Sequence, residues 1–194
     1  MNLVSISLLA VMALVPGAPA PTPVPGGART APVAVGDAAP DFTLRAHDGS
    51  TVMLSKRLAD GPAVVVFYRG YWCPFCGRQL SELRSLLRKD ERVTLLAVSV
   101  DDPETSKTFA SKIAADGKGP VSFPLLSDPG HATIDAYGLH DAAYDGQEFE
   151  GIPHAAVYVI GRDGRVAWAR VSDDYRKRPS IAEIRTALET LGVK

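Results

Sequence analysis

The chain has 194 residues, which is enough for one domain with a substantial hydrophobic core. Hydrophobic residues make up 46% and charged residues 22%, an ordinary globular composition that argues against a disordered or fibrous protein. The net charge of -1 gives no electrostatic reason to expect nucleic acid or anionic lipid as a partner.

The N-terminal region has the features of an export signal. No charged side chain precedes Arg29, and the stretch from Leu3 to Val15 is mostly apolar. This stretch is short for a membrane span, which needs ~20 residues, but it suits the apolar part of a secretory signal. Residues 18–20 (Ala-Pro-Ala) form a cleavage-type site. The sequence therefore predicts a signal peptide over residues 1–20 and export to the periplasm or medium; an uncleaved membrane anchor over residues 3–15 is the alternative.

A linker separates this signal from the folded domain. Residues 16–40 contain seven of the 15 prolines, together with several glycines and alanines. Such a composition favours an extended or disordered chain outside any core. We therefore expect a linker over residues 21–34 and one domain over residues 35–194.

The domain alternates strand and helix patterns, with a β-hairpin at each end. The first half is predicted to contain a hairpin over 41–54, a buried strand over 62–68, a helix from 74, a buried strand over 93–100 and a helix from 102. A short strand over 123–126, a short helix from 128 and a loop over 140–151 follow. The chain is then predicted to form a second hairpin over 155–171 and a helix from 180. Strand–helix–strand connections make parallel pairs, whereas the late hairpin adds antiparallel strands at one edge. The pattern predicts an α/β fold with a mixed central sheet and helices on both faces.

Both cysteines, Cys73 and Cys76, lie at the junction between the central strand and a helix that opens with Pro74. A bridge across two residues closes too short a loop to stabilise a fold, so reactivity explains the pair better. The helix N-terminus favours a thiolate, which makes Cys73 the expected nucleophile. Cys76, nearly one turn later, can attack a mixed disulfide or sulfenic acid on Cys73 and close a redox-active disulfide. Two inert buried thiols are the alternative.

Metal binding is the other alternative for the thiols. Structural zinc usually takes four ligands, and the chain has no second C-x-x-C and no H-x-x-x-H. The histidines are scattered along the sequence: His47, His131, His140 and His154. We expect no metal site and no cofactor.

Arg69 and Trp72, which precede Cys73 in the sequence, are further candidate site residues. Arg69 can lower the thiol pKa or bind a peroxide or carboxylate; the alternative is a loop arginine in solvent. Trp72 is expected to wall the site and offer apolar surface, or simply to pack.

Four further features of the sequence are distinctive: VGDAAPDFTL, FYRGYWCPFCGRQL, the Gly-Ile-Pro before the second hairpin, and VSDDYRKRPS. Together they resemble the thioredoxin-like superfamily, and within it the redoxin and peroxiredoxin-like branch that includes alkyl hydroperoxide reductase and thiol-specific antioxidant proteins. The resemblance covers about residues 35–192. It implies a thioredoxin-like fold with an N-terminal β-hairpin extension.

The resemblance also implies residues that face the thiols. Pro153 matches the cis-proline of the superfamily, and Ile152 would then expose backbone groups to an incoming substrate. His154 follows directly and is expected either to tune Cys73 or assist proton transfer, or to be an ordinary half-exposed histidine at a strand start.

Two departures leave the substrate open. Peroxiredoxins usually have Thr or Ser three residues before the attacking cysteine and Pro four before that, where this chain has Gly70 and Val66. Thioredoxins usually have Asp six residues before the first cysteine, where this chain has Phe67.

The leading hypothesis is an antioxidant oxidoreductase that reduces hydroperoxides with electrons from a thiol donor, either thioredoxin-type or a membrane reductant. An exported enzyme acting on protein disulfides is the alternative. A hypothesis from another class is a non-catalytic thioredoxin-like module that binds copper or another metal, or docks a partner; copper-delivery relatives usually space their cysteines by three residues, not two.

Overall fold

The structure is a computed structural model that describes residues 27–88 and 90–193. The predicted signal peptide and its membrane-anchor alternative lie outside these residues. No helix among the described residues combines the length and the apolar character that a membrane crossing requires.

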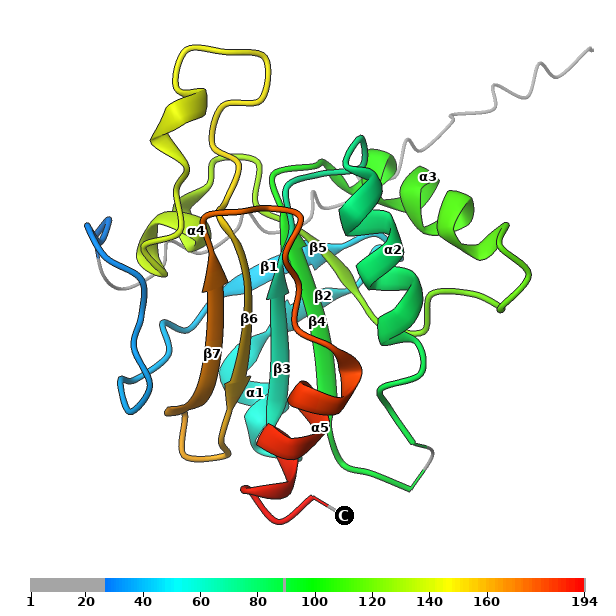
Figure 1. The fold of residues 1–194 in the computed structure, drawn as a ribbon, viewed down its shortest axis with the longest axis vertical. Coiled ribbons are helices and arrows are strands. Elements are labelled where there is room, and N and C mark those ends of the chain that lie inside the picture. The colour runs from blue at the N-terminus through cyan, green and yellow to red at the C-terminus, as the bar shows by residue number, and fades with distance from the viewer. Residues whose placement is uncertain (1–26, 89, 194) are drawn as a thin grey trace, which may run out of the picture.

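The strands and helices alternate as the sequence predicts (Figure 1). In chain order they are β1 Thr43–Ala46, β2 Thr51–Met53, α1 Leu54–Leu58, β3 Ala63–Phe67, α2 Pro74–Leu83, β4 Thr94–Ser99, α3 Pro103–Ala114, β5 Leu125–Ser127, α4 Ala132–Ala136, β6 Ala155–Ile160, β7 Val166–Ser172 and α5 Ile181–Glu189. The segment between α4 and β6 adds a short 3-10 turn, Ala142–Tyr144.

The strands form a seven-stranded mixed sheet in the order β2-β1-β5-β4-β3-β6-β7. β3 lies between β4, with which it is parallel, and β6, with which it is antiparallel; Val65 is opposite Leu96 on one side and Tyr158 on the other. The two predicted hairpins form the two edges. The predicted thioredoxin-like α/β fold with a mixed sheet is confirmed.

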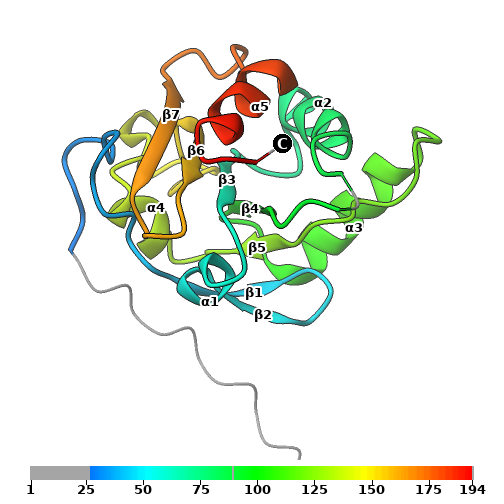
Figure 2. The ribbon, with the colours of Figure 1, turned by 90° about the horizontal axis from the view of Figure 1, so that it is seen from below.

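Helices cover both faces of the sheet, as Figure 2 shows end-on. Val64 and Val66 of β3 pack into a core with side chains of α2, α3 and α5, whereas Val65 and Phe67 pack into a second core with side chains of α1 and α4. A strand that is buried on both faces reads as a continuous apolar run, which is why β3 was recognisable in the sequence. Because β3 is an inner strand of the sheet, the residues that follow its carboxyl end lie at the middle of one edge of the sheet, with neighbouring elements on both sides.

The packed part of the chain begins earlier than the predicted boundary at residue 35. The side chain of Val33 is 2% exposed and belongs to the α1 and α4 core. Its N–H donates to the Tyr137 carbonyl at 3.1 Å, and the Arg29 N–H donates to the Asp135 carbonyl at 3.0 Å. The expectation that residues up to 34 form a linker outside the core is therefore wrong for this stretch, because tertiary burial outweighs its Pro- and Gly-rich composition.

Replacing Val33 with Ala is expected to lower the free energy of unfolding by about 1–3 kcal/mol, because it removes buried methyl groups and leaves a cavity. Chemical denaturation measures the change. Val35→Ala is the matched control, since Val35 is 61% exposed and its truncation should have little effect. Equal effects of the two substitutions would contradict the packing of residue 33.

Candidate active site

The turn between β3 and α2 requires the glycine at position 70. Gly70 has a φ of +145°, and a Cβ there would lie 2.9 Å from Trp72 Nε1 and 3.1 Å from Asp101 Oδ1. The Cys73 N–H donates to the Gly70 carbonyl at 3.2 Å and closes the turn. A Thr at this position, where peroxiredoxins usually have one, would place its Cβ against the side chains of Trp72 and Asp101. The positive φ and these close contacts together explain why the chain has glycine here.

Cys73 is the N-cap residue of α2. Its sulfur accepts a hydrogen bond from the Cys76 N–H at 3.3 Å, and its carbonyl accepts one from the Gly77 N–H at 3.1 Å. Both cysteines are free and almost completely buried, with exposures of 1% and 0%. The cap position gives the Cys73 sulfur one of the N–H groups that a helix leaves unpaired at its start.

The pKa values of the two cysteines are shifted in opposite directions. The hydrogen bond from the Cys76 thiol lowers the pKa of Cys73, the Cys76 N–H and the charges of Arg178 and Arg69 lower it further, and burial acts in the opposite direction. The same hydrogen bond, together with burial, raises the pKa of Cys76. A thiolate on Cys73 beside a neutral thiol on Cys76 is the arrangement needed for one nucleophile and one resolving residue.

Arg69 is not a loop arginine in solvent. Its side chain is 3% exposed, and its Nε and Nη2 have no hydrogen-bond partner among the described residues. Three aromatic rings surround the guanidinium carbon, at centroid distances of 5.2 Å for Trp72, 4.6 Å for Tyr144 and 4.4 Å for Tyr175. Burying a cation with unused donors is costly, so this arginine is held ready for an anionic or strongly polar ligand.

Arg178 is a second cation at the thiols, and the sequence did not single it out. It lies between β7 and α5, about a hundred residues after the cysteines in the sequence. Its Nη2 is 3.6 Å from Cys76 Sγ, and its Nε donates to Gln79 Oε1 at 2.9 Å. It lies within the VSDDYRKRPS stretch that carries the family resemblance, but only the packing of the chain after β7 against α2 brings it to the site.

The segment predicted as a plain loop contributes two aromatic side chains. The ring of Phe149 stacks on Trp72 with centroids 4.3 Å apart and an interplanar angle of 28°, and Tyr144 lies against Arg69. Trp72 is half-buried between them. The segment thus covers the residues that immediately precede Cys73.

The prediction of a cis-proline at position 153 is wrong: no peptide bond in the described chain is cis. Residues 152–154 instead lie extended beside residues 139–141, where the Asp141 N–H donates to the Ile152 carbonyl at 3.0 Å and the His154 N–H donates to the Leu139 carbonyl at 2.6 Å. Ile152 is 1% exposed, so it does not offer its carbonyl to a substrate as expected. Pairing with the earlier segment has taken the place of the expected substrate-facing backbone.

His154 lines a cavity that neither cysteine lines. It is half-buried, with Nε2 4.0 Å from Asp141 Oδ1. This cavity of 250 Å³ is also lined by Arg69, Pro153, Tyr144 and Tyr175. The structure thus brings Arg69, Pro153 and His154 together at one cavity, with the arginine shared between this cavity and the thiols.

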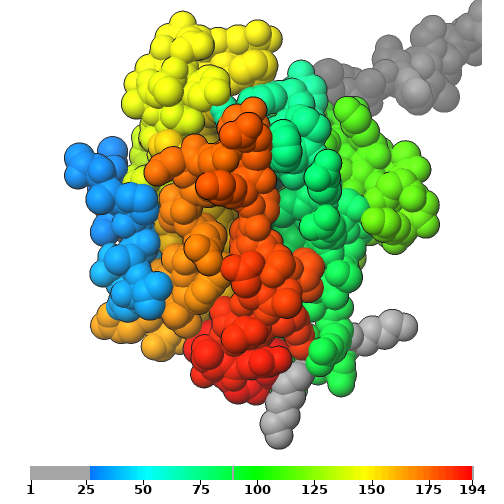
Figure 3. All heavy atoms as spheres, in the orientation of Figure 1, coloured from blue at the N-terminus to red at the C-terminus, as the bar shows by residue number. Residues whose placement is uncertain are grey.

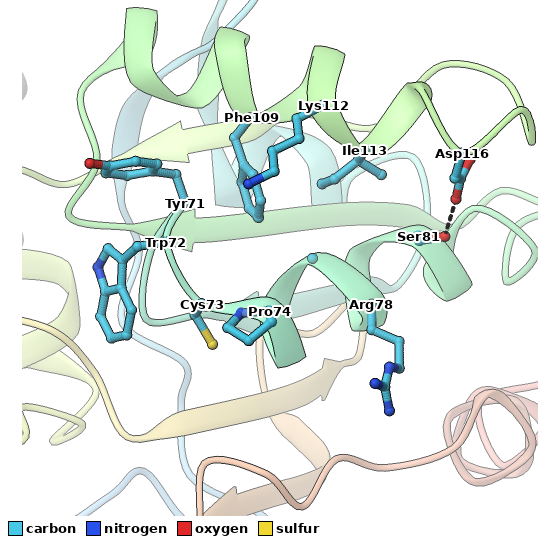
Figure 4. Close-up of a pocket in the computed structure, with 11 residues that line it drawn as sticks. Tyr71, Trp72, Cys73, Pro74, Arg78, Ser81, Phe109, Lys112, Ile113 and Asp116 are labelled. Carbon is cyan, nitrogen blue, oxygen red and sulfur yellow. Dashed lines mark hydrogen bonds between the residues drawn. The ribbon is translucent and has the colours of Figure 1, made fainter.

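A groove of 340 Å³ between α2 and α3 leads to Cys73 (Figure 4). Tyr71, Trp72, Phe109 and Ile113 give it apolar walls. The basic side chains Arg78 and Lys112 extend from the two helices that form it. The groove can therefore accept an apolar molecule that carries a polar or negative end.

The fold and the site define a thioredoxin-like thiol oxidoreductase. Comparison with known proteins specifies the class: the profile of the AhpC/TSA family matches residues 35–169. The chain belongs to the AhpC/TSA family, and the predicted peroxiredoxin-like oxidoreductase is confirmed.

Individual relatives agree with this assignment. Peroxiredoxin Bcp of Escherichia coli (strain K12) is 32% identical over 149 residues, covering 75% of this chain and 88% of that protein. Peroxiredoxin Q, chloroplastic, of Oryza sativa subsp. japonica is 30% identical over 161 residues, covering 82% and 68%. The crystal structure of peroxidoxin BcpB from Mycobacterium tuberculosis superposes with a TM-score of 0.62 at 25% identity, covering 82% of this chain and 97% of that one.

The lowered pKa of Cys73 predicts that its alkylation stays fast below the pKa of a free thiol, about 8.5. As pH falls from 8.5 to 7, a free thiol loses most of its thiolate and reacts progressively more slowly, whereas Cys73 should keep its rate until the pH passes below its own lowered pKa. Iodoacetamide labelling of the reduced protein, with mass spectrometry to locate the label, measures the profile.

Two substitutions at the neighbouring cysteine test the cause. Cys76→Ser keeps a donor beside the Cys73 sulfur and should preserve the low midpoint, whereas Cys76→Ala removes the donor and should raise it. A midpoint near 8.5 in the unmodified protein would refute an activated Cys73.

Proposed function

We propose that this protein reduces hydroperoxides with Cys73 as the nucleophile and Cys76 as the resolving thiol. The observation that carries the proposal is the buried Cys73 sulfur at the start of α2, with Cys76 hydrogen-bonded to it and the unused donors of Arg69 nearby. Thiolate and cation together suit a peroxide, which needs a nucleophile at one oxygen and stabilisation of charge on the other.

In the first step the Cys73 thiolate attacks the terminal oxygen of the hydroperoxide. An S–O bond forms and the O–O bond breaks, so that the sulfur is oxidised to a sulfenic acid and the peroxide is reduced. A proton from solvent neutralises the leaving alkoxide, which departs as an alcohol. The guanidinium of Arg69 would stabilise the negative charge that develops on the leaving oxygen.

In the second step the Cys76 thiol attacks the Cys73 sulfenic acid. The S–S bond forms as the S–O bond breaks, and the hydroxyl leaves with the thiol proton as water. A dithiol donor then reduces the disulfide by thiol–disulfide exchange and is itself oxidised. We propose a donor of the thioredoxin type, and a membrane reductant is the alternative if the protein is exported.

The groove favours an organic hydroperoxide as substrate. Its apolar walls would hold a hydrocarbon chain, and Arg78 and Lys112 would attract a negative group on that molecule; Asp116, which lines the end away from Cys73, is paired with Arg84. The thiols carry no third candidate metal ligand among the described residues, since the single candidate group there contains neither cysteine.

Peroxide consumption with dithiothreitol as reductant tests the proposal, with cumene hydroperoxide and hydrogen peroxide as substrates. We expect turnover that Cys73→Ser abolishes. After reduction and removal of dithiothreitol, Cys76→Ser should consume one equivalent of peroxide and accumulate a sulfenic acid that dimedone traps on Cys73. Arg69→Gln should lower kcat/KM about 100-fold, the size expected for loss of one charge-stabilising group, with the exposed Arg88→Gln as control.

Two results would overturn these assignments. Reduction of insulin disulfides without any peroxide consumption would make the protein a disulfide oxidoreductase. Retained single turnover in Cys73→Ser, with the sulfenic acid on Cys76, would reverse the roles of the two thiols.

We further propose that the chain is exported, because an uncharged apolar stretch precedes an Ala-Pro-Ala site at residues 18–20. N-terminal sequencing of protein from the exported fraction is expected to start at Pro21. An intact N-terminus in the membrane fraction would indicate the anchor instead, and an intact N-terminus in the cytoplasm would refute export.

A further inference from the structure

Two histidines that are scattered in the sequence meet around one carboxylate. His131 directly precedes α4, Asp135 lies within α4, and His140 follows it. The two imidazole rings are perpendicular, with centroids 5.0 Å apart. Asp135 lies between them, with Oδ2 3.0 Å from His131 Nδ1 and Oδ1 3.1 Å from His140 Nδ1.

His140 has a carboxylate oxygen at each of its ring nitrogens. Besides the Asp135 contact at Nδ1, its Nε2 lies 2.5 Å from Asp145 Oδ1. A neutral imidazole carries one N–H, so it can donate to only one of these partners. When that hydrogen is given to Asp145, the Nδ1 lone pair points at the lone pairs of Asp135. A cation between the two atoms would turn this repulsion into attraction.

The three side chains are spaced for coordination of such a cation. One ligand atom from each of His131, Asp135 and His140 lies within 4.8 Å of the other two. Ligands 2.0–2.1 Å from a tetrahedral zinc ion are about 3.3 Å apart, and the two nitrogen–oxygen distances, each to a different oxygen of Asp135, are 3.0 and 3.1 Å. The side chains are 31%, 23% and 26% exposed, which leaves an entry path from solvent.

The backbone around the cluster is shaped to hold one ring. A Cβ on Gly151 would lie 2.7 Å from His131 Cδ2, so only glycine at this position leaves room for the imidazole. Gly151 is at the end of the segment that begins with His140, so the ring of His131 lies against both ends of that segment.

We propose that His131, Asp135 and His140 bind a divalent transition-metal ion of the zinc class. Two imidazoles and a carboxylate suit zinc and its neighbours, whereas calcium and magnesium prefer oxygen ligands alone. Three protein ligands leave a fourth position for water. Asp145 acts as a positioning residue, because it accepts the Nε2 hydrogen of His140 and so presents Nδ1 to the metal.

The site is at the base of the segment whose aromatic side chains contact Arg69 and Trp72. This segment forms a lobe at one end of the molecule, yellow in Figure 3, and its Tyr144 and Phe149 contact Arg69 and Trp72. A bound ion would tie the segment to α4. The metal site is independent of the proposed peroxide chemistry, and each can fail without the other.

Zinc binding to the full chain tests the proposal. The measurement uses the Cys73→Ser/Cys76→Ser variant, so that the thiols contribute no binding. Calorimetric titration with Zn²⁺ at neutral pH is expected to show one equivalent and a rise in melting temperature, because the ion binds the folded state preferentially. Co²⁺ in the same protein is expected to give the visible absorption of a four-coordinate site with nitrogen ligands.

Variants in this background assign the ligands. His140→Ala and Asp135→Asn should each weaken zinc binding by more than tenfold, and Asp145→Asn should weaken it about 10–100-fold, as loss of an outer-shell partner does. His47→Asn is the matched control; this substitution keeps an acceptor for the Leu125 N–H, which His47 Nδ1 receives at 3.1 Å in the β1–β2 hairpin. Circular dichroism checks that each variant folds.

Absence of zinc and cobalt binding in the folded parent would overturn the proposal and leave a protonated His140 between two carboxylates. Binding of undiminished affinity after both His140→Ala and Asp135→Asn would overturn it equally, because the ion would then lie elsewhere.

Discussion

The hydrogen bonds that Cys76 directs at the Cys73 sulfur are the interactions on which the rest of the site depends. The N–H of Cys76 lies in the first turn of the helix, where no carbonyl four residues earlier takes it, and it is shared between the Cys73 sulfur at 3.3 Å and the Cys73 carbonyl at 3.1 Å; the thiol adds a second donor. These contacts require the C-x-x-C spacing, an N-cap conformation at Cys73 and a sharp turn at Gly70. The central position of β3 supplies the turn, so the sheet topology and the thiol chemistry are parts of one arrangement.

Around this buried pair the protein places two positively charged side chains. Arg69 is enclosed by aromatic rings, and Arg178 reaches Cys76 from the chain after β7. In a low-dielectric site each cation stabilises a thiolate more strongly than it would in solvent. The cost is a desolvated guanidinium with unused donors, and a peroxide or its product oxygen would offset that cost by accepting from them. Membership of the AhpC/TSA family agrees with this arrangement.

Sequence patterns predicted the elements well where periodicity reports burial. The continuous apolar run of β3 and the Pro at the first position of α2 both have local physical causes, and both are observed. The sequence patterns gave wrong predictions where contacts between segments far apart in the sequence determine the local structure. Val33 is buried despite its Pro- and Gly-rich surroundings, and the residues on either side of Pro153, whose peptide bond is trans, pair with residues 139–141.

The sequence by itself determined the α/β architecture, the pairing of Cys73 with Cys76 and the position of the nucleophile at a helix start, because spacing and helix-end chemistry are local. Only the tertiary structure decided that Arg69 is buried, that Arg178 and Phe149 belong to the site, and that His131 and His140 meet at Asp135. The contacts of Arg178 and Phe149 join segments that are far apart in the sequence, and those of His131, Asp135 and His140 depend on how the chain turns at both ends of α4, so neither set is marked by a local sequence pattern.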